Sequence, residues 1–232
     1  MSAKLFKAAV IKTLPVMAGY LALGTGFGIL LRINGYGVLW AIGMSITMYA
    51  GAMQYIAISL ITAGASLLTT AVTTLLVNAR HLFYGISLID RYRGAGLKKL
   101  YMMHALTDET YALVCTAECP EGEDPHRYYF LMSVLDHIYW ISGCTLGNLL
   151  GSLIKFNTAG IDFVMTALFV TLFVDQWMTT KEHRPALIGI GATVICLLIF
   201  GSGNFLIPSM AVIMVVLLLS RKALVKGGRR NG

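Results

Sequence analysis

Long apolar runs, each close to the length that crosses a membrane, fill most of this chain. They occupy residues 13–33, 38–60, 65–89, 128–154, 161–178, 186–200 and 205–220, with a more amphipathic stretch at 101–118. A helix needs about 20 apolar residues to span the hydrocarbon core of a bilayer. The loops between the runs are short, which leaves no room for a separate soluble domain. The pattern predicts one all-α domain over residues 1–232, a polytopic transmembrane helical bundle of about seven helices, within a range of six to eight.

Few charges interrupt these runs, and most of those present lie at their ends. Charged residues make up 12% of the chain and hydrophobic residues 57%, whereas soluble domains carry roughly a quarter charged residues. The net charge of +7 comes from basic tracts beside apolar runs, which indicates membrane topology rather than nucleic-acid binding. Basic termini favour an even number of crossings, but the basic loop at 91–99 follows three runs. The topology therefore stays open.

The sequence contains no pattern that indicates a metal site, a cofactor site or an enzyme. The four cysteines are interpreted as small apolar packing residues, because a zinc site needs about four ligands and only Cys115 and Cys119 are close in sequence. Gly24, Gly26 and Gly28 lie in an apolar run rather than after a strand, so they do not form a nucleotide-binding loop. We predict a protein that is not an enzyme, with no metal and no cofactor.

Glycines suggest a weak internal repeat and broken helices. At an offset of 123 residues, Gly24, Gly28 and Gly37 correspond to Gly147, Gly151 and Gly160. This register predicts repeat units at about 13–90 and 136–220, although a chain with 24 glycines also gives chance matches. Gly24, Gly28, Gly147 and Gly151 are candidate packing or hinge positions. The Gly201–Asn204 segment predicts a break between the last two apolar runs.

The third run contains the most costly polar residues, Asn78, Arg80 and His81. A charge at membrane depth costs about 2.5–3.5 kcal/mol on insertion scales, so it usually faces a cavity or a partner. Arg80 can hold a carboxylate and His81 can relay protons. Alternatively, Arg80 extends to the membrane interface and Asn78 bonds a neighbouring helix.

The second run contains a polar and small-residue segment with two interpretations. Ser45 and Gln54 supply a hydroxyl and an amide, and small residues surround Gly51. Small residues permit close helix packing. They also permit local unwinding, in which freed backbone groups near Ser45, Tyr49, Gly51 and Gln54 bind the polar head of a substrate.

Acidic residues form a third group. Thr107, Asp108 and Glu109 can cap the start of a helix, and Asp162 can do the same at the start of its run. Asp108, Glu109 and Asp136, together with His81, are also candidates for proton coupling, because this role needs a titratable group at membrane depth.

These segments resemble the large subunit of AzlC-type branched-chain amino-acid exporters, the azaleucine-resistance permeases. The resemblance covers about residues 12–180 and rests on several ordered motifs. These are Pro15 with Gly19, Gly24 and Gly28; Met44-Ser45 with Tyr49-Ala50-Gly51-Ala52-x-Gln54; Asn78-x-Arg80-His81-x-x-Tyr84; Thr107-Asp108-Glu109-x-Tyr111-Ala112; Trp140 with Gly143-xxx-Gly147-xxx-Gly151; and Gly160-Ile161-Asp162-Phe163 ahead of Phe169. The chain departs mildly at Ile161, where leucine is common, and at Thr47.

The resemblance implies a multi-pass permease of the bacterial inner (cytoplasmic) membrane that exports valine, leucine and isoleucine using the proton gradient. It also implies a partner, a small AzlD-type membrane subunit, for which we expect about four helices. Arg80 or a helix N-terminus would bind the substrate carboxylate, and Gln54, Asn78 or Asp108 the ammonium. Met48, Tyr49 and Phe163 would contact the aliphatic side chain. The alternatives are an assembly subunit or a small-solute channel without its own amino-acid site.

Overall fold

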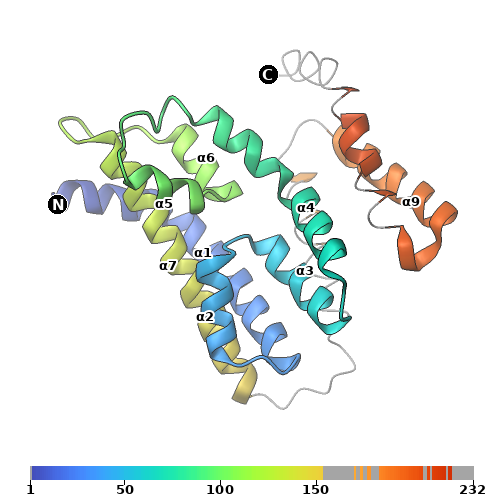
Figure 1. The fold of residues 1–232 in the computed structure, drawn as a ribbon. Coiled ribbons are helices and arrows are strands. Elements are labelled where there is room, and N and C mark those ends of the chain that lie inside the picture. The colour runs from blue at the N-terminus through green and yellow to red at the C-terminus, as the bar shows by residue number, and fades with distance from the viewer. Residues whose placement is uncertain are drawn as a thin grey trace. The chain divides into compact units, whose positions relative to one another are not determined.

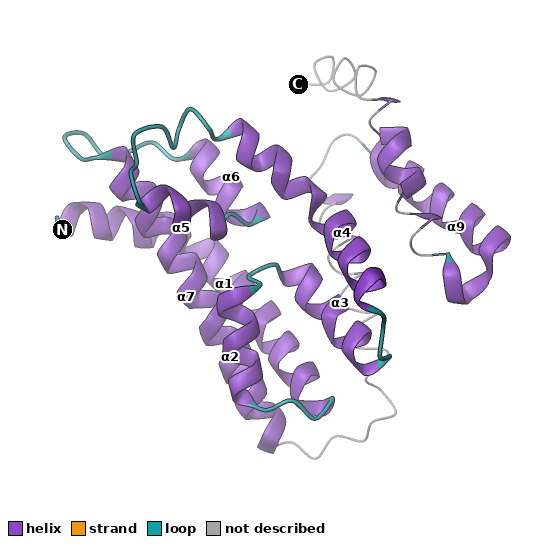
Figure 2. Cartoon of the chain, viewed as in Figure 1, coloured by secondary structure: helices purple, strands orange, loops and turns teal. Residues whose placement is uncertain are grey.

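A computed structural model describes residues 2–153, 170, 173–174, 177–178, 183–205, 208–209, 211–217 and 219–220 (Figure 1). Every regular element in this part of the chain is a helix, which confirms the predicted all-α fold (Figure 2). The chain divides into two compact units, one of residues 1–70 and 77–158 and one of residues 71–76 and 159–232. The single domain and its repeat units stay predictions.

The first unit contains seven of the labelled helices. They are α1 (Ala3–Ile33), α2 (Val38–Thr47), α3 (Gly51–Thr62), α4 (Leu67–Ser87), α5 (Lys98–His104), α6 (Asp108–Thr116) and α7 (Pro125–Leu153). Residues 71–76 of α4 group with the second unit. Hydroxyl side chains begin three of these helices, because Ser2, Ser66 and Thr107 accept hydrogen bonds from backbone N–H groups of the first turn. The amphipathic stretch at 101–118 thus folds as two short helices.

Helices α1 and α7 pack together along their length and form the centre of the first unit (Figure 1). Glycines make this contact close. A Cβ atom on Gly24 would lie 2.9 Å from the backbone nitrogen of Cys144, and one on Gly143 would lie 2.6 Å from the carbonyl oxygen of Tyr20. A Cβ atom on Gly28 or Gly147 would overlap the backbone of the opposite helix. The backbones of α1 and α7 are therefore in direct contact.

The two central helices also agree with the register of the predicted repeat. The offset of 123 residues places Ala3–Ile33 on residues 126–156, and α7 covers Pro125–Leu153. Most of the second predicted repeat unit lies outside the described residues. The repeat therefore stays a prediction.

The second apolar run is not one helix. Helix α2 ends at Thr47 and α3 begins at Gly51. Between them Tyr49 has a positive φ of 38°, a conformation that is uncommon for a residue with a side chain. Ala50 is extended. The structure therefore shows the local unwinding that one of the two interpretations of this segment predicts.

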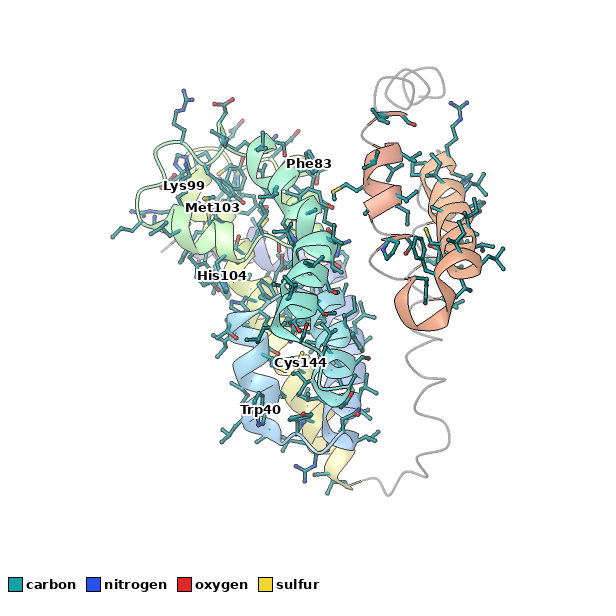
Figure 3. The ribbon with its side chains drawn as sticks, turned by 45° about the vertical axis from the view of Figure 1, so that its right-hand side comes forward. Trp40, Phe83, Lys99, Met103, His104 and Cys144 are labelled. Carbon is teal, nitrogen blue, oxygen red and sulfur yellow. The ribbon has the colours of Figure 1, made fainter. Side chains whose placement is uncertain are left out.

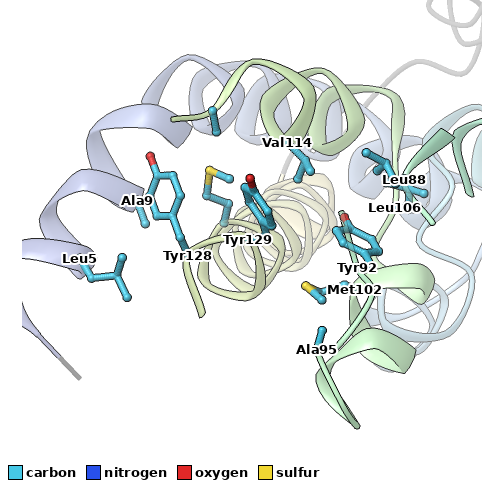
Figure 4. Close-up of a cluster of buried hydrophobic side chains, with 12 residues drawn as sticks. Leu5, Ala9, Leu88, Tyr92, Ala95, Met102, Leu106, Val114, Tyr128 and Tyr129 are labelled. Atoms are coloured by element: carbon cyan, nitrogen blue, oxygen red, sulfur yellow. The ribbon is translucent and has the colours of Figure 1, made fainter. Parts of the chain in front are cut away.

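A hydrophobic cluster packs the end of the first unit where α1 and α7 begin (Figure 4). It includes Leu5 from α1, Met102 from α5, Val114 from α6 and Met132 from α7. Arg91 binds the C-terminal end of α6, because its guanidinium donates to the carbonyl oxygens of Val114 at 2.5 Å and Cys115 at 3.0 Å. These contacts fix α6 against α7, and the start of α6 is where the polar residues collect.

In the second unit, α9 (Arg184–Asn204) has a non-helical kink at Gly201, where φ is 71° and ψ is 172°. A break within Gly201–Asn204 was predicted from the sequence. Among the described residues, two helices are long and apolar enough to cross a membrane, Ala3–Ile33 and Arg184–Gly201. Asp162 and Phe163, the remaining predicted residues of this region, lie outside the described part.

Candidate functional site

Polar side chains from several distant segments meet around the N-terminal end of α6. The contributing segments are α1, the break between α2 and α3, α3 itself, α4, α6 and α7. The group consists of Tyr20, Tyr49, Gln54, Arg80, Thr107, Asp108, Glu109, Thr110, Asp136, His137 and Trp140. In a chain with so few charges, this convergence marks one candidate site.

A chain of hydrogen bonds links the two carboxyl groups of α6 and α7. The Tyr20 hydroxyl donates to Glu109 Oε2 at 2.8 Å and lies 2.5 Å from Thr107 Oγ1. Thr107 Oγ1 lies 3.1 Å from Thr110 Oγ1, which is 2.8 Å from Asp136 Oδ2. Asp136 is fully buried. Burying a carboxyl group is costly unless it is hydrogen-bonded and neutralised. The hydroxyl groups of this chain of hydrogen bonds therefore reduce the cost of burying Asp136.

Two histidines bind the C-terminal end of α2, where the helix stops. His137 Nε2 lies 3.1 Å from the Ser45 carbonyl oxygen, and His104 Nε2 lies 2.9 Å from that of Ile46. A carbonyl can only accept, so each ring nitrogen is the donor. The broken helix therefore has its free carbonyls satisfied by side chains. Figure 3 labels His104 on α5 and Cys144 on α7.

The first turn of α3 is held against Trp140 of α7. Trp140 Nε1 donates to Gln54 Oε1 at 2.7 Å. A Cβ atom on Gly51 would lie 3.1 Å from the Trp140 ring, so the glycine lets the indole approach the start of the helix. Tyr49 stacks on His137 with ring centroids 4.1 Å apart. The Ser45 hydroxyl donates within its own helix, to the Ala41 carbonyl oxygen at 2.7 Å.

Arg80 forms an ion pair with Asp108, and both are site residues predicted from the sequence. Its Nη1 lies 2.7 Å from Asp108 Oδ2, and the side chains are 43% and 37% exposed. Tyr84 continues this contact of α4 with α6 by stacking on Tyr111 at 4.4 Å. His81 Nδ1 lies 3.2 Å from the Asn78 carbonyl oxygen, one turn back on its own helix.

Several buried polar atoms of this site have no hydrogen-bond partner among the described residues. They are Tyr49 Oη, Gln54 Nε2, Asn78 Oδ1, Asp108 Oδ1 and Asp136 Oδ1. Buried polar groups normally have a partner. Unpartnered hydrogen-bond donors and acceptors in one region are suited to binding a small polar ligand. Among the described residues, no three His, Cys, Asp or Glu side chains are grouped to hold a metal ion.

Of the predicted site residues, Tyr49, Gln54, Arg80, Asp108, Glu109 and Asp136 meet in this group. Ser45 and Gly51 contact its members His137 and Trp140, whereas His81 contacts Asn78 within α4. Ser45, Tyr49, Gly51, Gln54, Asn78, Arg80, His81, Asp108, Glu109 and Asp136 all belong to the first unit. The four predicted glycines Gly24, Gly28, Gly147 and Gly151 lie at the contact of α1 and α7 instead.

Sequence reasoning missed Tyr20, Thr110 and the two histidines of the break. A tyrosine or threonine in an apolar run does not by itself indicate a functional site, because a hydroxyl group can form a hydrogen bond within its own helix or to a neighbouring one. The spacing of Thr107 and Thr110, which are three residues apart and directly flank the two acids, was the available signal.

Comparisons with known proteins give one consistent result. A family model described as "AzlC protein" matches residues 15–154. The chain is 42% identical to the "Branched-chain amino acid transport protein AzlC" of Bacillus subtilis, over 95% of this chain and 87% of that protein. It is also 42% identical to an "Uncharacterized membrane protein" of Helicobacter pylori, over 95% and 97%. The "Inner membrane protein YgaZ" of Escherichia coli is 24% identical, over 75% and 73%. No solved structure gives a significant match to the chain.

Proposed function

The chain belongs to the AzlC protein family, and from this premise we propose that it is a secondary transporter that exports branched-chain or related apolar amino acids. It is a membrane protein, as its apolar helices and its relatives indicate. Export would run across the bacterial cytoplasmic membrane, driven by the proton gradient. A small AzlD-type membrane subunit would be its partner.

The observation that carries this proposal is the convergence of polar groups around the start of α6. A scaffold subunit has no need of such groups, because each polar or charged side chain inside a membrane protein is costly. A transporter needs them to bind a zwitterion and a coupling ion. The relative from Bacillus subtilis is named for transport of branched-chain amino acids, which supports the substrate class.

The substrate's two charges have matching groups in this site. Arg80 and Asp108 carry the opposite charges that an amino-acid carboxylate and ammonium would pair with, and both are partly accessible. The oxygens Asp108 Oδ1 and Asn78 Oδ1 have no hydrogen-bond partner among the described residues and would accept from the ammonium. The first turn of α3, which has no side-chain cap, offers a second position for the carboxylate.

The aliphatic part of the substrate would lie against the break between α2 and α3. Met48, Tyr49 and Gly51 would contact it there, with Gln54 next to them on α3. The Ser45 hydroxyl is used within its own helix, so its proposed contribution is its carbonyl, which helps to hold the break.

Proton coupling is proposed for Glu109 and Asp136, the carboxyl groups of this site that pair with no cation among the described residues. Asp108 pairs with Arg80 and His81 contacts its own helix, so these two residues have other partners. Asp136 has the stronger position, since it is fully buried with one oxygen free.

Counterflow in proteoliposomes tests the function. The chain would be reconstituted with and without a co-expressed small membrane subunit, with that subunit alone as a third sample, and labelled valine uptake against unlabelled valine would be measured. We expect counterflow of valine, leucine and isoleucine but not of glutamate or lysine, and net export when a proton gradient is imposed. Counterflow reports alternating access, so a channel would not give it. Absence of counterflow in both preparations would contradict the proposal, and counterflow by the partner alone would make this chain an assembly subunit.

A further inference from the structure

We propose that the hydroxyl groups of Tyr20, Thr107 and Thr110 form a proton wire that connects the carboxyl groups of Glu109 and Asp136. This inference deepens the proposed function and rests on it, because it assigns a route to the coupling proton. None of the three hydroxyl residues is a candidate for substrate binding.

The five groups form an unbroken line of four oxygen–oxygen contacts. From one end to the other, the distances are 2.8 Å between Glu109 and Tyr20, 2.5 Å between Tyr20 and Thr107, 3.1 Å between Thr107 and Thr110, and 2.8 Å between Thr110 and Asp136. All four lie within hydrogen-bond range or close to it. Three helices contribute to the line, with Tyr20 on α1 and Asp136 on α7.

A count of hydrogens shows that this line carries one more proton than its hydroxyl groups supply. Each contact needs one hydrogen between its oxygens, so four contacts need four hydrogens. Tyr20, Thr107 and Thr110 supply one each. With both carboxyl groups ionised, two hydroxyl oxygens would face each other with no hydrogen between them. The geometry therefore points to one proton shared by Glu109 and Asp136.

The line has two arrangements that satisfy every contact. If Glu109 is protonated, each group donates toward Asp136, and Asp136 accepts as a carboxylate. If Asp136 is protonated, all four hydrogen bonds reverse and Glu109 accepts. In both arrangements Thr107 Oγ1 still accepts from the Thr110 backbone N–H at 3.2 Å. Moving each hydrogen by one position takes one proton from one carboxyl group to the other, with no atom left over.

The two ends differ in access, which gives the transfer a direction. Asp136 is fully buried and keeps Oδ1 free, whereas Glu109 is only partly buried. A proton that enters at Glu109 can thus reach Asp136 Oδ2, and rotation of the protonated carboxyl group then turns this same proton away from Thr110 for release. The aromatic rings of Trp140 and Tyr49 pack edge-on against Tyr20, with centroids 5.3 and 6.4 Å away. They shield the middle of the line.

Of the other titratable groups beside the line, Asp108 and His137 are held by their own contacts. Asp108 pairs with Arg80, and His137 binds the Ser45 carbonyl and the Tyr101 hydroxyl. The Tyr49 hydroxyl makes no hydrogen bond among the described residues. None of these groups supplies the missing hydrogen.

Tyr20→Phe and Thr110→Val each remove one hydroxyl from the line and keep the shape of the side chain. The measured quantity is the ratio of proton-driven valine export to valine counterflow at equal pH, in the preparation that supports counterflow. We expect this ratio to fall more than about tenfold in both variants, because proton transfer by positioned groups contributes factors of this size or larger. Thr110→Ser keeps a hydroxyl and should restore the ratio to within about twofold of wild type.

Thr145→Val on α7 is the matched control, since the Thr145 hydroxyl donates to its own helix at Ile141 and lies outside the line. An unchanged ratio in Tyr20→Phe and Thr110→Val would overturn the wire. So would an equal loss of driven export and counterflow, which would indicate a structural role. Wild-type counterflow together with an unchanged ratio would leave the proposed function standing, so the two failures are distinguishable.

A second measurement does not depend on transport. Infrared difference spectroscopy of the full chain at neutral pH should show one protonated carboxyl group, whose C=O stretching band shifts in Tyr20→Phe and disappears in Asp136→Asn combined with Glu109→Gln. Absence of a protonated carboxyl band in wild type would overturn the inference even if valine were not the substrate.

Discussion

The two halves of α7 show two different uses of a membrane helix. Its later half, which contains Gly143, Gly147 and Gly151, lies directly on the backbone of α1. Its earlier half carries Asp136, His137 and Trp140, whose polar atoms bind α6, α5, the α2–α3 break and α3. One half achieves close packing by having no side chains at the contact. The other half contacts its neighbours through polar side chains, of which Asp136 keeps one oxygen without a partner among the described residues.

The difference explains how one helix can be both rigid and functional. Backbone-to-backbone packing holds α1 and α7 at a fixed separation. The polar side chains one or two turns away then meet their partners at defined distances, including the carboxyl group of Asp136. We therefore expect substitutions in the glycine half to affect folding, and substitutions in the polar half to affect transport.

The largest effect is expected for Gly147→Ala. The new Cβ atom would overlap the backbone of Thr25, which cannot move without separating α1 from α7. We expect a loss of about 3 kcal/mol, which corresponds to a melting temperature roughly 10 °C lower for a chain of this size. Thermal unfolding in detergent checks this. Gly19→Ala in α1 is the control, because nothing lies within 4 Å of its Cβ position, and an equal loss there would contradict the role of the contact.

Asp136→Asn should separate transport from folding. The amide oxygen can still accept from the Thr110 hydroxyl, so the contact that Asp136 makes at 2.8 Å survives. The residue can no longer bind or release a proton. We expect proton-driven valine export to fall about 100-fold while the melting temperature stays near that of wild type. If driven export persisted in a well-folded variant, Asp136 would have no part in coupling.

A smaller effect is expected for Arg80→Ala. The ion pair with Asp108 is partly exposed, so its loss should cost less than about 1 kcal/mol of stability. Loss of a charge-assisted contact to the substrate carboxylate should raise the KM for valine about tenfold. Initial rates over a range of valine concentrations measure this.

Arg93→Ala is the matched control for Arg80→Ala, since Arg93 pairs with Asp90 in a more exposed ion pair. It should leave the KM unchanged. Similar KM values for Arg80→Ala and wild type would show that this ion pair is a structural link between α4 and α6 only.

Much of the architecture could be predicted from the sequence. Apolar runs identified α4 and α7 within a few residues, and Thr107 with its two acids marked the start of α6. The break in the second run was one of two open interpretations, because the same small residues permit packing. The contact of Gly51 with Trp140 shows that both effects occur at one position.

The sequence by itself determined that the chain is an all-helical membrane protein, because it has too few charged residues to cover the surface of a soluble protein. It also determined which polar and charged residues are costly to place in a membrane, and several of the family motifs contain those residues. Only the tertiary structure decided which of them meet. The sequence analysis treated Arg80 and Asp108 as independent candidates, and the structure shows that they form an ion pair. The link between Glu109 and Asp136 passes through hydroxyl groups that cost little in an apolar run, so apart from the spacing of Thr107 and Thr110 nothing in the sequence marks them. Their significance depends on partners 26 to 89 residues away, and helix packing alone brings those partners together.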